Sequence, residues 1–294
     1  MGDPLAALAA RVAQTPYCAR LGVVVEALAL DGARVRVPYK DENSNPGRAL
    51  HGGVAASTID IAGVLAAATG FAGKTIVDAG TLDLSVAYLA AAIGEDIVAD
   101  AQVLRRGKEI VYVDVDVRND GGKRIAKGLV TYRVFHHDTV PDARERQRAA
   151  RAQLPSGDRR ELIQGARAYV SVPFIARLGM VVEHAHDGEA VLRMPFKTDN
   201  ADHNEAVHEG ALAALIDSTG ALASWSIVGL NLSYKASTVG VHVNYHAPAQ
   251  REEVIAHARN LRRNNEIFLN AVTVSGRESG KVIATGSVTY RIVV

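Results

Sequence analysis

The sequence predicts an α+β fold that is built twice in one chain, each copy being a long buried helix wrapped by an antiparallel β-sheet. The first observation is an internal repeat at an offset of 157 residues. The second is a helix in each copy that is small or apolar on every face. The third is a run of strand-like segments after each helix. A period this long indicates a duplicated domain rather than a solenoid.

The repeat covers nearly the whole chain. Residues 21–26 (Leu-Gly-Val-Val-Val-Glu) return as residues 178–183 (Leu-Gly-Met-Val-Val-Glu). Near the end of each copy the offset becomes 158, since residues 130–133 match residues 288–291 with the same letters, Val-Thr-Tyr-Arg. We interpret this change as a last hairpin turn that is one residue shorter in the second copy.

The repeat predicts two domains, residues 1–137 and 161–294, with a linker over residues 138–160. The linker carries helix-forming residues with alternating charges, and the stretch Pro-Ser-Gly at residues 155–157 would end such a helix. Interspersed acidic residues and the absence of aromatic ones argue against a nucleic-acid-binding helix. We expect a solvated linker.

The elements before the central helix have the same predicted order in both copies. A short amphipathic segment is followed by a strand-like stretch broken by an Asp-Gly turn, and then by a loop. These ranges are, in the first and second copies, 5–18 and 162–174 for the amphipathic segment, 23–37 and 181–196 for the strand-like stretch, and 40–50 and 197–207 for the loop.

Three or more strands are predicted to follow each helix. Residues 111–117 alternate strictly between Val and Tyr or Asp, which indicates a sheet with one buried and one wetter face. Residues 119–122 (Asn-Asp-Gly-Gly) and 276–280 (Gly-Arg-Glu-Ser-Gly) are typical of hairpin turns.

The central helix of each copy begins at a histidine and carries an aspartate nine residues later, Asp60 in the first copy and Asp217 in the second. A carboxylate inside an all-apolar helix must be satisfied by partners or used in chemistry. Asp60 is about 12 Å along its helix from Gly52, by the rise per residue. It therefore cannot easily serve the N–H groups at the start of its own helix, which suit an oxygen that gains negative charge. Antiparallel packing of the two helices would place Asp217 beside Gly52, and Asp60 beside Glu209.

Composition excludes several classes of protein. A formal net charge of +1 gives no overall attraction to nucleic acid or a membrane surface. The single cysteine, Cys18, excludes an intrachain disulfide framework and fits a reducing compartment. No apolar run is long enough to predict a membrane span or a signal peptide, so we expect a cytoplasmic protein. No Walker A or dinucleotide fingerprint occurs, and we expect no metal or redox cofactor.

Residues 45–53, Asn-Pro-Gly-Arg-Ala-Leu-His-Gly-Gly, with Asp60 downstream, resemble the signature of PaaI-like hotdog-fold acyl-CoA thioesterases. The resemblance covers both halves apart from the linker. In that family two hotdog units pair, and each site takes its Asp from the unit opposite the His-Gly-Gly turn. This agrees with the distance argument made from the helix alone.

The resemblance implies roles for the residues at the first helix start. Gly52 N–H would hold the thioester oxygen, and Asn45 would help to place substrate or water. Asp217 would act as general base or nucleophile. Thr81 and Thr238 match a Ser or Thr that assists the Asp in relatives, although both can equally be plain strand residues.

The second site, Asp60 with the N–H of Glu209, departs from the family pattern. Asp202 stands where Asn45 does, and Glu209 replaces the first glycine of the turn. The backbone donor survives that replacement. Two extra carboxylates near a developing oxyanion would raise its energy, however. We therefore expect the chemistry at the site that contains Asp217.

Several other residues keep two interpretations. His51 and His208 can belong to the sites or simply satisfy the backbone at a helix start. Gly53 and His208 are candidates for substrate contacts. Arg105 and Arg106 can bind CoA phosphates or lie at solvated strand ends.

The resemblance implies hydrolysis of an acyl-CoA by a chain that pairs into a dimer of double-hotdog chains. One alternative is a hotdog hydratase or dehydratase. Its Asp-x-Asn-Pro-x-His spacing is not met, because His51 lies five residues after Pro46 rather than two. Another alternative is a non-catalytic acyl-CoA-binding protein.

Overall fold

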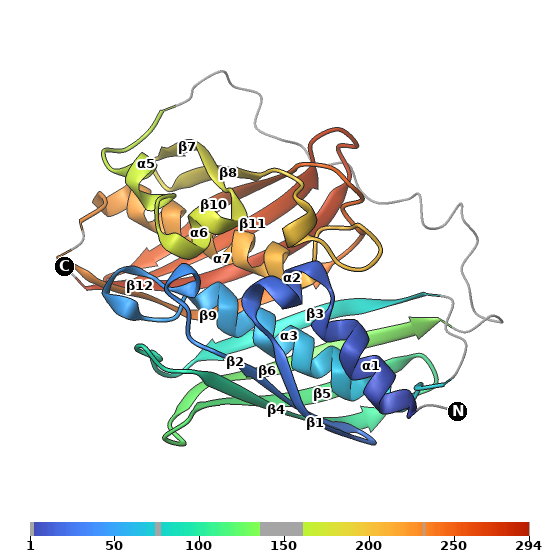
Figure 1. Ribbon diagram of the computed structural model, residues 1–294. Coiled ribbons are helices and arrows are strands. Elements are labelled where there is room, and N and C mark those ends of the chain that lie inside the picture. Colours follow the sequence, from blue (N-terminus) through green and yellow to red (C-terminus); the bar gives the residue numbers. More distant parts are fainter. Residues whose placement is uncertain (1–2, 74–77, 136–160, 232, 294) are drawn as a thin grey trace.

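The computed structural model describes the chain except residues 1–2, 74–77, 136–160, 232 and 294. Two similar units lie side by side, each with a long helix held against one face of a curved sheet (Figure 1). The predicted linker, residues 138–160, lies outside the described residues.

The first half contains four strands after its central helix and two before it. Its elements are α1 (Pro4–Ala13), α2 (Pro16–Leu21), β1 (Val24–Ala29), β2 (Gly32–Val37), the 3-10 turns η1 (Asp41–Asn43) and η2 (Pro46–Arg48), the central helix α3 (Gly52–Thr69), β3 (Asp78–Tyr88), β4 (Ile97–Arg106), β5 (Ile110–Asn119) and β6 (Arg124–Phe135).

The second half repeats this order with a shorter beginning. Its elements are α5 (Ala166–Tyr169), α6 (Pro173–Leu178), β7 (Val181–His186), β8 (Glu189–Met194), the 3-10 turn η4 (Thr198–Asn200), the central helix α7 (Glu209–Val228), β9 (Lys235–Tyr245), β10 (Val254–Asn264), β11 (Ile267–Gly276) and β12 (Val282–Val293).

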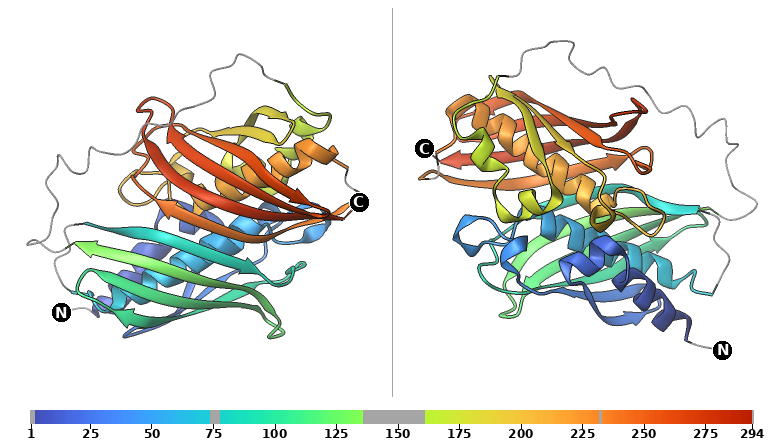
Figure 2. Two further views of the ribbon diagram at one scale, coloured as in Figure 1. Left: turned by 180° about the vertical axis from the view of Figure 1, so that it is seen from behind. Right: turned by 45° about the horizontal axis from the view of Figure 1, so that its top comes forward.

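All strands belong to one antiparallel sheet in the order β1-β2-β4-β5-β6-β3-β9-β12-β11-β10-β8-β7. The order reads the same in both halves from the centre outwards, and the halves join where β3 pairs with β9 (Figure 2). At this seam Ser85 Oγ and His242 Nδ1 are 2.7 Å apart, and His242 Nε2 lies 3.1 Å from an Asp83 oxygen. The two halves are therefore related by a pseudo-twofold axis that passes through the seam.

The strand pattern predicted from alternation is confirmed in β5, where every second residue from Val111 to Val117 is buried. Hairpins also form at both predicted turns. The predicted difference in their length was wrong. Residues 120–123 connect β5 to β6, whereas residues 277–281 connect β11 to β12, so the second connection is the longer one. An offset that increases along the chain adds a residue to the second copy.

The two central helices pack antiparallel, as predicted. A Cβ atom built on Gly53 of α3 would lie 2.6 Å from Ala214 Cβ of α7, and one built on Gly210 would lie 2.7 Å from Ser57 Oγ. Each helix start thus packs against the first half of the opposite helix, and glycine permits that approach. Both helices are long and apolar enough to cross a membrane by composition alone, but most of each is buried inside the protein, as is typical of core helices.

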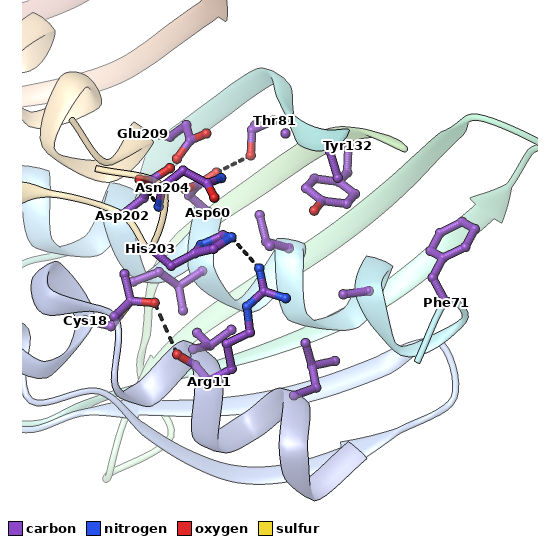
Figure 3. A pocket seen from close by; sticks show the side chains of 18 of the residues that line it. Arg11, Cys18, Asp60, Phe71, Thr81, Tyr132, Asp202, His203, Asn204 and Glu209 are labelled. Atoms are coloured by element: carbon purple, nitrogen blue, oxygen red, sulfur yellow. Dashed lines mark hydrogen bonds between the residues drawn. The ribbon is translucent and has the colours of Figure 1, made fainter. Parts of the chain in front are cut away.

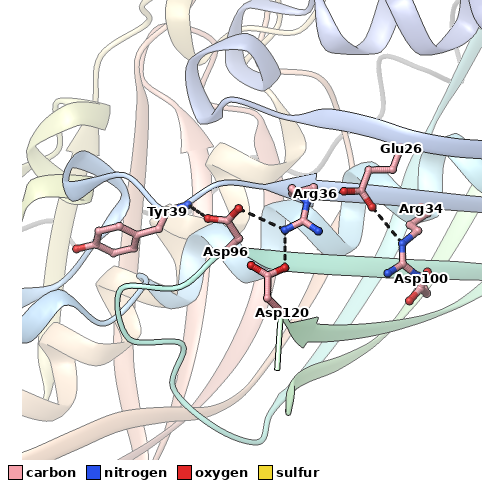
Figure 4. Close-up of polar contacts among 7 residues, drawn as sticks. All are labelled: Glu26, Arg34, Arg36, Tyr39, Asp96, Asp100 and Asp120. Carbon is pink, nitrogen blue, oxygen red and sulfur yellow. Dashed lines mark hydrogen bonds and ion pairs between the residues drawn. The ribbon is translucent and has the colours of Figure 1, made fainter. Parts of the chain in front are cut away.

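An ion-pair network fixes the loop that leads to α3 (Figure 4). Arg36 on β2 pairs with Asp120 at 2.6 Å and Asp96 at 3.3 Å, and it also bonds Glu26 of β1. Asp96 in turn accepts the Tyr39 N–H at 2.8 Å. These side chains are partly exposed, so each ion pair adds little stability. Their effect is to hold the chain in place where it leaves β2 for the helix start.

The halves differ most at their beginnings. In the first half Asp3 accepts the Leu5 N–H at 2.9 Å and Pro4 opens the helix, and α1 then runs for 10 residues. The corresponding helix α5 has 4 residues and begins after Gly165, which has a φ of 86°. The predicted amphipathic segment of residues 162–174 thus contains only the short helix α5 and the start of α6, and α1 has no full counterpart.

Candidate active site

Each central helix begins at a histidine whose ring closes the helix start. His51 Nδ1 accepts the Gly53 N–H at 2.9 Å, and His208 Nδ1 accepts the Gly210 N–H at 3.0 Å. Burial lowers the pKa of His51 to about 4 and the pKa of His208 to about 3. Both rings are therefore neutral at pH 7, and both serve as helix caps.

At the start of α3 the structure brings Gly52 and Asp217 together. A Cβ atom built on Gly52 would lie 3.0 Å from Asp217 Oδ2, so a larger residue would press on the carboxylate. Thr238 Oγ1 donates to Asp217 Oδ1 at 2.7 Å. Tyr88 OH donates to the Gly52 carbonyl at 3.0 Å. This cluster is referred to below as the Asp217 site.

At the start of α7 the same arrangement forms around Asp60 and Glu209. Thr81 Oγ1 donates to Asp60 Oδ1 at 2.8 Å, and Tyr245 OH donates to the Glu209 carbonyl at 3.0 Å. The Glu209 side chain reaches across to Gly80 of β3, where a Cβ atom would lie 3.9 Å from its Oε1. This cluster is referred to below as the Asp60 site (Figure 3).

The two sites differ in charge. Burial raises the pKa of Asp217 to about 6, against the opposing hydrogen bond from Thr238. Burial also raises the pKa of Asp60 and of Glu209, and the negative charge of Asp60 raises the pKa of Glu209 further. Two ionised carboxylates this close repel each other, so near neutral pH the pair holds one proton between them.

The substitution Asp217→Asn is expected to stabilise the protein at neutral and alkaline pH. Because the folded-state pKa lies above the ordinary value of 3.8, the unfolded chain binds fewer protons between these values, and stability falls as pH rises through them. This rise in the pKa of Asp217 corresponds to a loss of about 3 kcal/mol in the free energy of unfolding once the pH is above both values. Asparagine does not titrate, and its Oδ1 still accepts from Thr238. The melting temperatures of parent and variant should agree at about pH 4, and the variant should melt at the higher temperature at about pH 8. A difference in melting temperature that does not change with pH would contradict the raised pKa of Asp217.

Among the described residues, Asp60, His208 and Glu209 form a group with the donor types of a metal site, each offering one atom within 4.8 Å of the others. The His208 Nδ1 atom already accepts from Gly210, which leaves Nε2, and that atom lies 3.8 Å from Cys18 Sγ. The same carboxyl groups can serve as an acid–base pair without an ion.

A cavity of about 690 Å³ opens at the Asp60 site. It runs along α3 from Asp60 and is covered by α1, as Figure 3 shows. Arg11 of α1 bonds a ring nitrogen of His203 from the opposite half beside it. Most of its wall is hydrocarbon, contributed by Leu8, Val12, Ile61, Val64, Ala68 and Phe71.

The equivalent space beside Asp217 is filled by two large side chains. Tyr169 occupies the position of Val12, and its hydroxyl donates to a carbonyl of α7 at 2.9 Å. Trp225 occupies the position of Ala68 and is 5% exposed. Its Nε1 donates to Tyr290 OH at 3.2 Å.

Comparison with known proteins gives the family. The model of the thioesterase superfamily matches residues 47–126 and 204–283, once in each half and across both helix starts. The chain belongs to the thioesterase superfamily. The predicted thioesterase enzyme and the predicted repeat of its domain are thereby confirmed.

Two curated relatives match parts of the chain. A protein of Halobacterium salinarum whose name proposes an esterase is 36% identical over 127 residues, which is 40% of this chain and 83% of the relative. Human acyl-coenzyme A thioesterase 13 is 35% identical over 94 residues, which is 31% of this chain and 65% of the relative. This chain is thus similar to PaaI-like thioesterases, as the helix-start motif predicted.

Solved structures share the fold over the whole chain. A tesB protein of Mycobacterium avium subsp. paratuberculosis superposes with a TM-score of 0.63 at 12% identity, covering 99% of this chain and all of that one. A protein of Thermobifida fusca whose title proposes a thioesterase II gives a TM-score of 0.63 at 14% identity, covering 95% and 98%. The tandem hotdog fold is therefore confirmed.

The remaining residues predicted for this thioesterase have contacts of their own. Asn45 begins η2, and its N–H donates to the Ala49 carbonyl at 2.7 Å. Arg106 pairs with Asp31, with Nε 2.9 Å from Oδ1, and donates to a carbonyl in the last turn of α3 at 2.8 Å. Arg106 is thus engaged in closing the helix end, and the CoA contact considered for it has no support here. Arg105 is exposed on β4.

Sequence reasoning missed the residues that make the two sites unequal. Tyr169 and Trp225 are large where Val12 and Ala68 are small, and comparison of the copies at the offset of 157 would have found both. The hydroxyls of Tyr88 and Tyr245 were also missed as ligands of the helix-start carbonyls.

Proposed function

We propose that this thioesterase hydrolyses acyl-CoA at a composite site between its two halves. The observation that carries the proposal is an aspartate of one half beside the helix start of the other, held by a threonine hydroxyl. A helix start supplies backbone N–H groups and positive dipole character, which suit the oxyanion of a tetrahedral intermediate. The name of the human relative supplies the substrate class.

The chemistry needs few groups. The thioester oxygen accepts a hydrogen bond from the first N–H of the helix. The ionised aspartate takes a proton from a water molecule while the water oxygen bonds to the carbonyl carbon. The carbon–sulfur bond then breaks, and CoA leaves as the thiolate, which takes up a proton. Threonine is a positioning residue that holds one carboxylate oxygen and leaves the other free.

A panel of acyl-CoAs of increasing chain length tests this proposal. We expect release of free thiol from at least one acyl-CoA well above the rate in buffer, with no addition of water to an enoyl-CoA. Binding of acyl-CoA without thiol release would favour the non-catalytic alternative. Hydration of the enoyl-CoA would favour the hydratase.

Other features of the chain stay predictions. The domain ranges 1–137 and 161–294 are proposed to pair through the central helices, since each would otherwise expose apolar surface. Self-association into a dimer of chains is also proposed. Large apolar residues exposed on the outer face of the sheet, among them Leu104, Tyr112 and Leu129, are compatible with it.

A further inference from the structure

We propose that a long acyl group of the substrate enters only on the side of Asp60, so that Asp60 and Glu209 carry the hydrolysis of long-chain acyl-CoAs. This inference rests on the proposed function and assigns it to one of the two sites. The pseudo-twofold axis makes the comparison direct, because the positions along α3 and the strands that pack on it have counterparts along α7.

The cavity at the Asp60 site has the size and lining of an acyl-binding pocket. Its volume of about 690 Å³ lies within the usual range for small-molecule sites, about 300–1,000 Å³. From Asp60 to Ala68 it follows α3 for about 12 Å, by the rise per residue. Only its end at Asp60 and Glu209 carries paired carboxyl groups, and the walls beyond are mainly apolar. A hydrocarbon chain would therefore lie along α3 with its thioester at the carboxyl pair.

The Asp217 side cannot take such a chain without losing part of its core. Trp225 is buried, donates to Tyr290, and stacks on Tyr234 with ring centroids 6.4 Å apart. Removing a buried aromatic side chain typically costs about 3–5 kcal/mol. Tyr169, which is partly buried, adds a hydrogen bond to a carbonyl of α7. An acyl chain entering here would have to displace both rings.

The structure leaves space for the Glu209 side chain at the Asp60 site, as a catalytic role would require. The strand position that its carboxyl approaches is Gly80, whereas the counterpart of Gly80 on the other side is Ser237. Gly80 thus leaves space beside β3 that a larger side chain at this position would take from Glu209. The Glu209 carboxyl therefore packs against β3, where even a Cβ atom at Gly80 would be at ordinary contact distance.

A proton shared by Asp60 and Glu209 removes one of the two negative charges that weigh against this site. The other, Asp202, lines the same cavity and accepts the N–H groups of Asn204 at 2.7 Å and Ala206 at 2.9 Å. A neutral Glu209 carboxyl does not oppose an oxyanion at its own backbone N–H. In the reaction Asp60 takes the proton from water, and the Glu209 carboxyl gives its proton to the departing thiolate. The acid product and free CoA then leave, and the proton on Asp60 passes to Glu209, so that the pair again holds one proton and one water is consumed for each thioester cleaved.

The substitution Ala68→Trp tests the inference, because it places on the Asp60 side the residue that fills the space on the Asp217 side. We expect kcat/KM for the longest acyl-CoA that the parent cleaves to fall about 100-fold, while acetyl-CoA changes little, because steric exclusion from a pocket acts on the part of the substrate that enters it. Val12→Tyr, placed on the outer helix α1, should shift the chain-length profile in the same direction with less risk to folding. Thermal unfolding of each variant checks that the fold is kept.

Trp225→Phe is the matched control, since it keeps an aromatic ring on the Asp217 side and should leave the chain-length profile as in the parent. If the parent cleaves long acyl-CoAs and both Ala68→Trp and Val12→Tyr still do so, the inference is overturned. A profile that shifts with Trp225→Phe and not with Ala68→Trp also overturns it. A parent that cleaves no acyl-CoA at all contradicts the proposed function itself.

Discussion

Asp60→Asn is expected to lower kcat/KM for the best acyl-CoA by about 10² to 10⁴-fold, the usual effect of removing a general base. The amide keeps the shape of the side chain and still accepts the Thr81 hydroxyl, so the loss should appear mainly in kcat. Asp217→Asn should keep most of the activity on long-chain acyl-CoAs, because Trp225 and Tyr169 fill the space that a long acyl chain would need on that side.

The measurement is kcat/KM for both single variants on one substrate, with thermal unfolding as the control for folding. Comparable large losses in both variants would indicate two working sites. A larger loss in Asp217→Asn would restore the assignment that the motif alone favoured. We propose the reverse assignment because the cavity lies on the opposite side from the more complete motif.

The second large effect is expected from Gly53→Ala at the crossing of the central helices. A Cβ atom there would lie 2.6 Å from Ala214 Cβ and 3.0 Å from Ala214 Cα, and the Cα cannot rotate away. Alanine gains about 1 kcal/mol over glycine in a helix interior, but overpacking typically costs about 1–3 kcal/mol and here involves backbone. We expect a lower melting temperature, together with reduced activity, because separating α3 from α7 also separates the parts of both sites.

Gly32→Ala is the control for this prediction. The nearest atoms to a Cβ at Gly32 are 3.7 and 3.8 Å away, which is ordinary contact. Its melting temperature should stay close to that of the parent. A Gly53→Ala variant as stable as Gly32→Ala would show that the helices have room to separate.

The fold and the pairing of groups across the halves were predictable from sequence for a physical reason. Because the domain is duplicated, each element occurs twice in the sequence. A pattern in one copy, such as the alternation in residues 111–117 or the aspartate in the apolar helix, could therefore be compared with the other copy. Helix geometry alone then excluded that Asp60 serves its own helix start. The close approach of Asp217 to Gly52 follows from that exclusion once the helices pack antiparallel.

The motif predicted unequal sites, but the side on which the cavity opens was not predictable from it. It depends on side-chain volume at positions 12 and 68 and their counterparts 169 and 225, which lie far in sequence from the helix starts. It depends also on the length of α1, which is decided by a cap and a proline in one copy and by a glycine in the other. Glu209 was judged as a charged neighbour of an oxyanion, whereas packing beside Asp60 favours a shared proton.

The most direct test is a crystal structure of the protein with a non-hydrolysable thioether analogue of the longest acyl-CoA that it cleaves. The account predicts one analogue per chain, with its acyl chain along α3 between α1 and Tyr132 and its sulfur-linked carbon beside Asp60 and Glu209. An analogue seated between Gly52 and Asp217, with Trp225 and Tyr169 displaced, would contradict it.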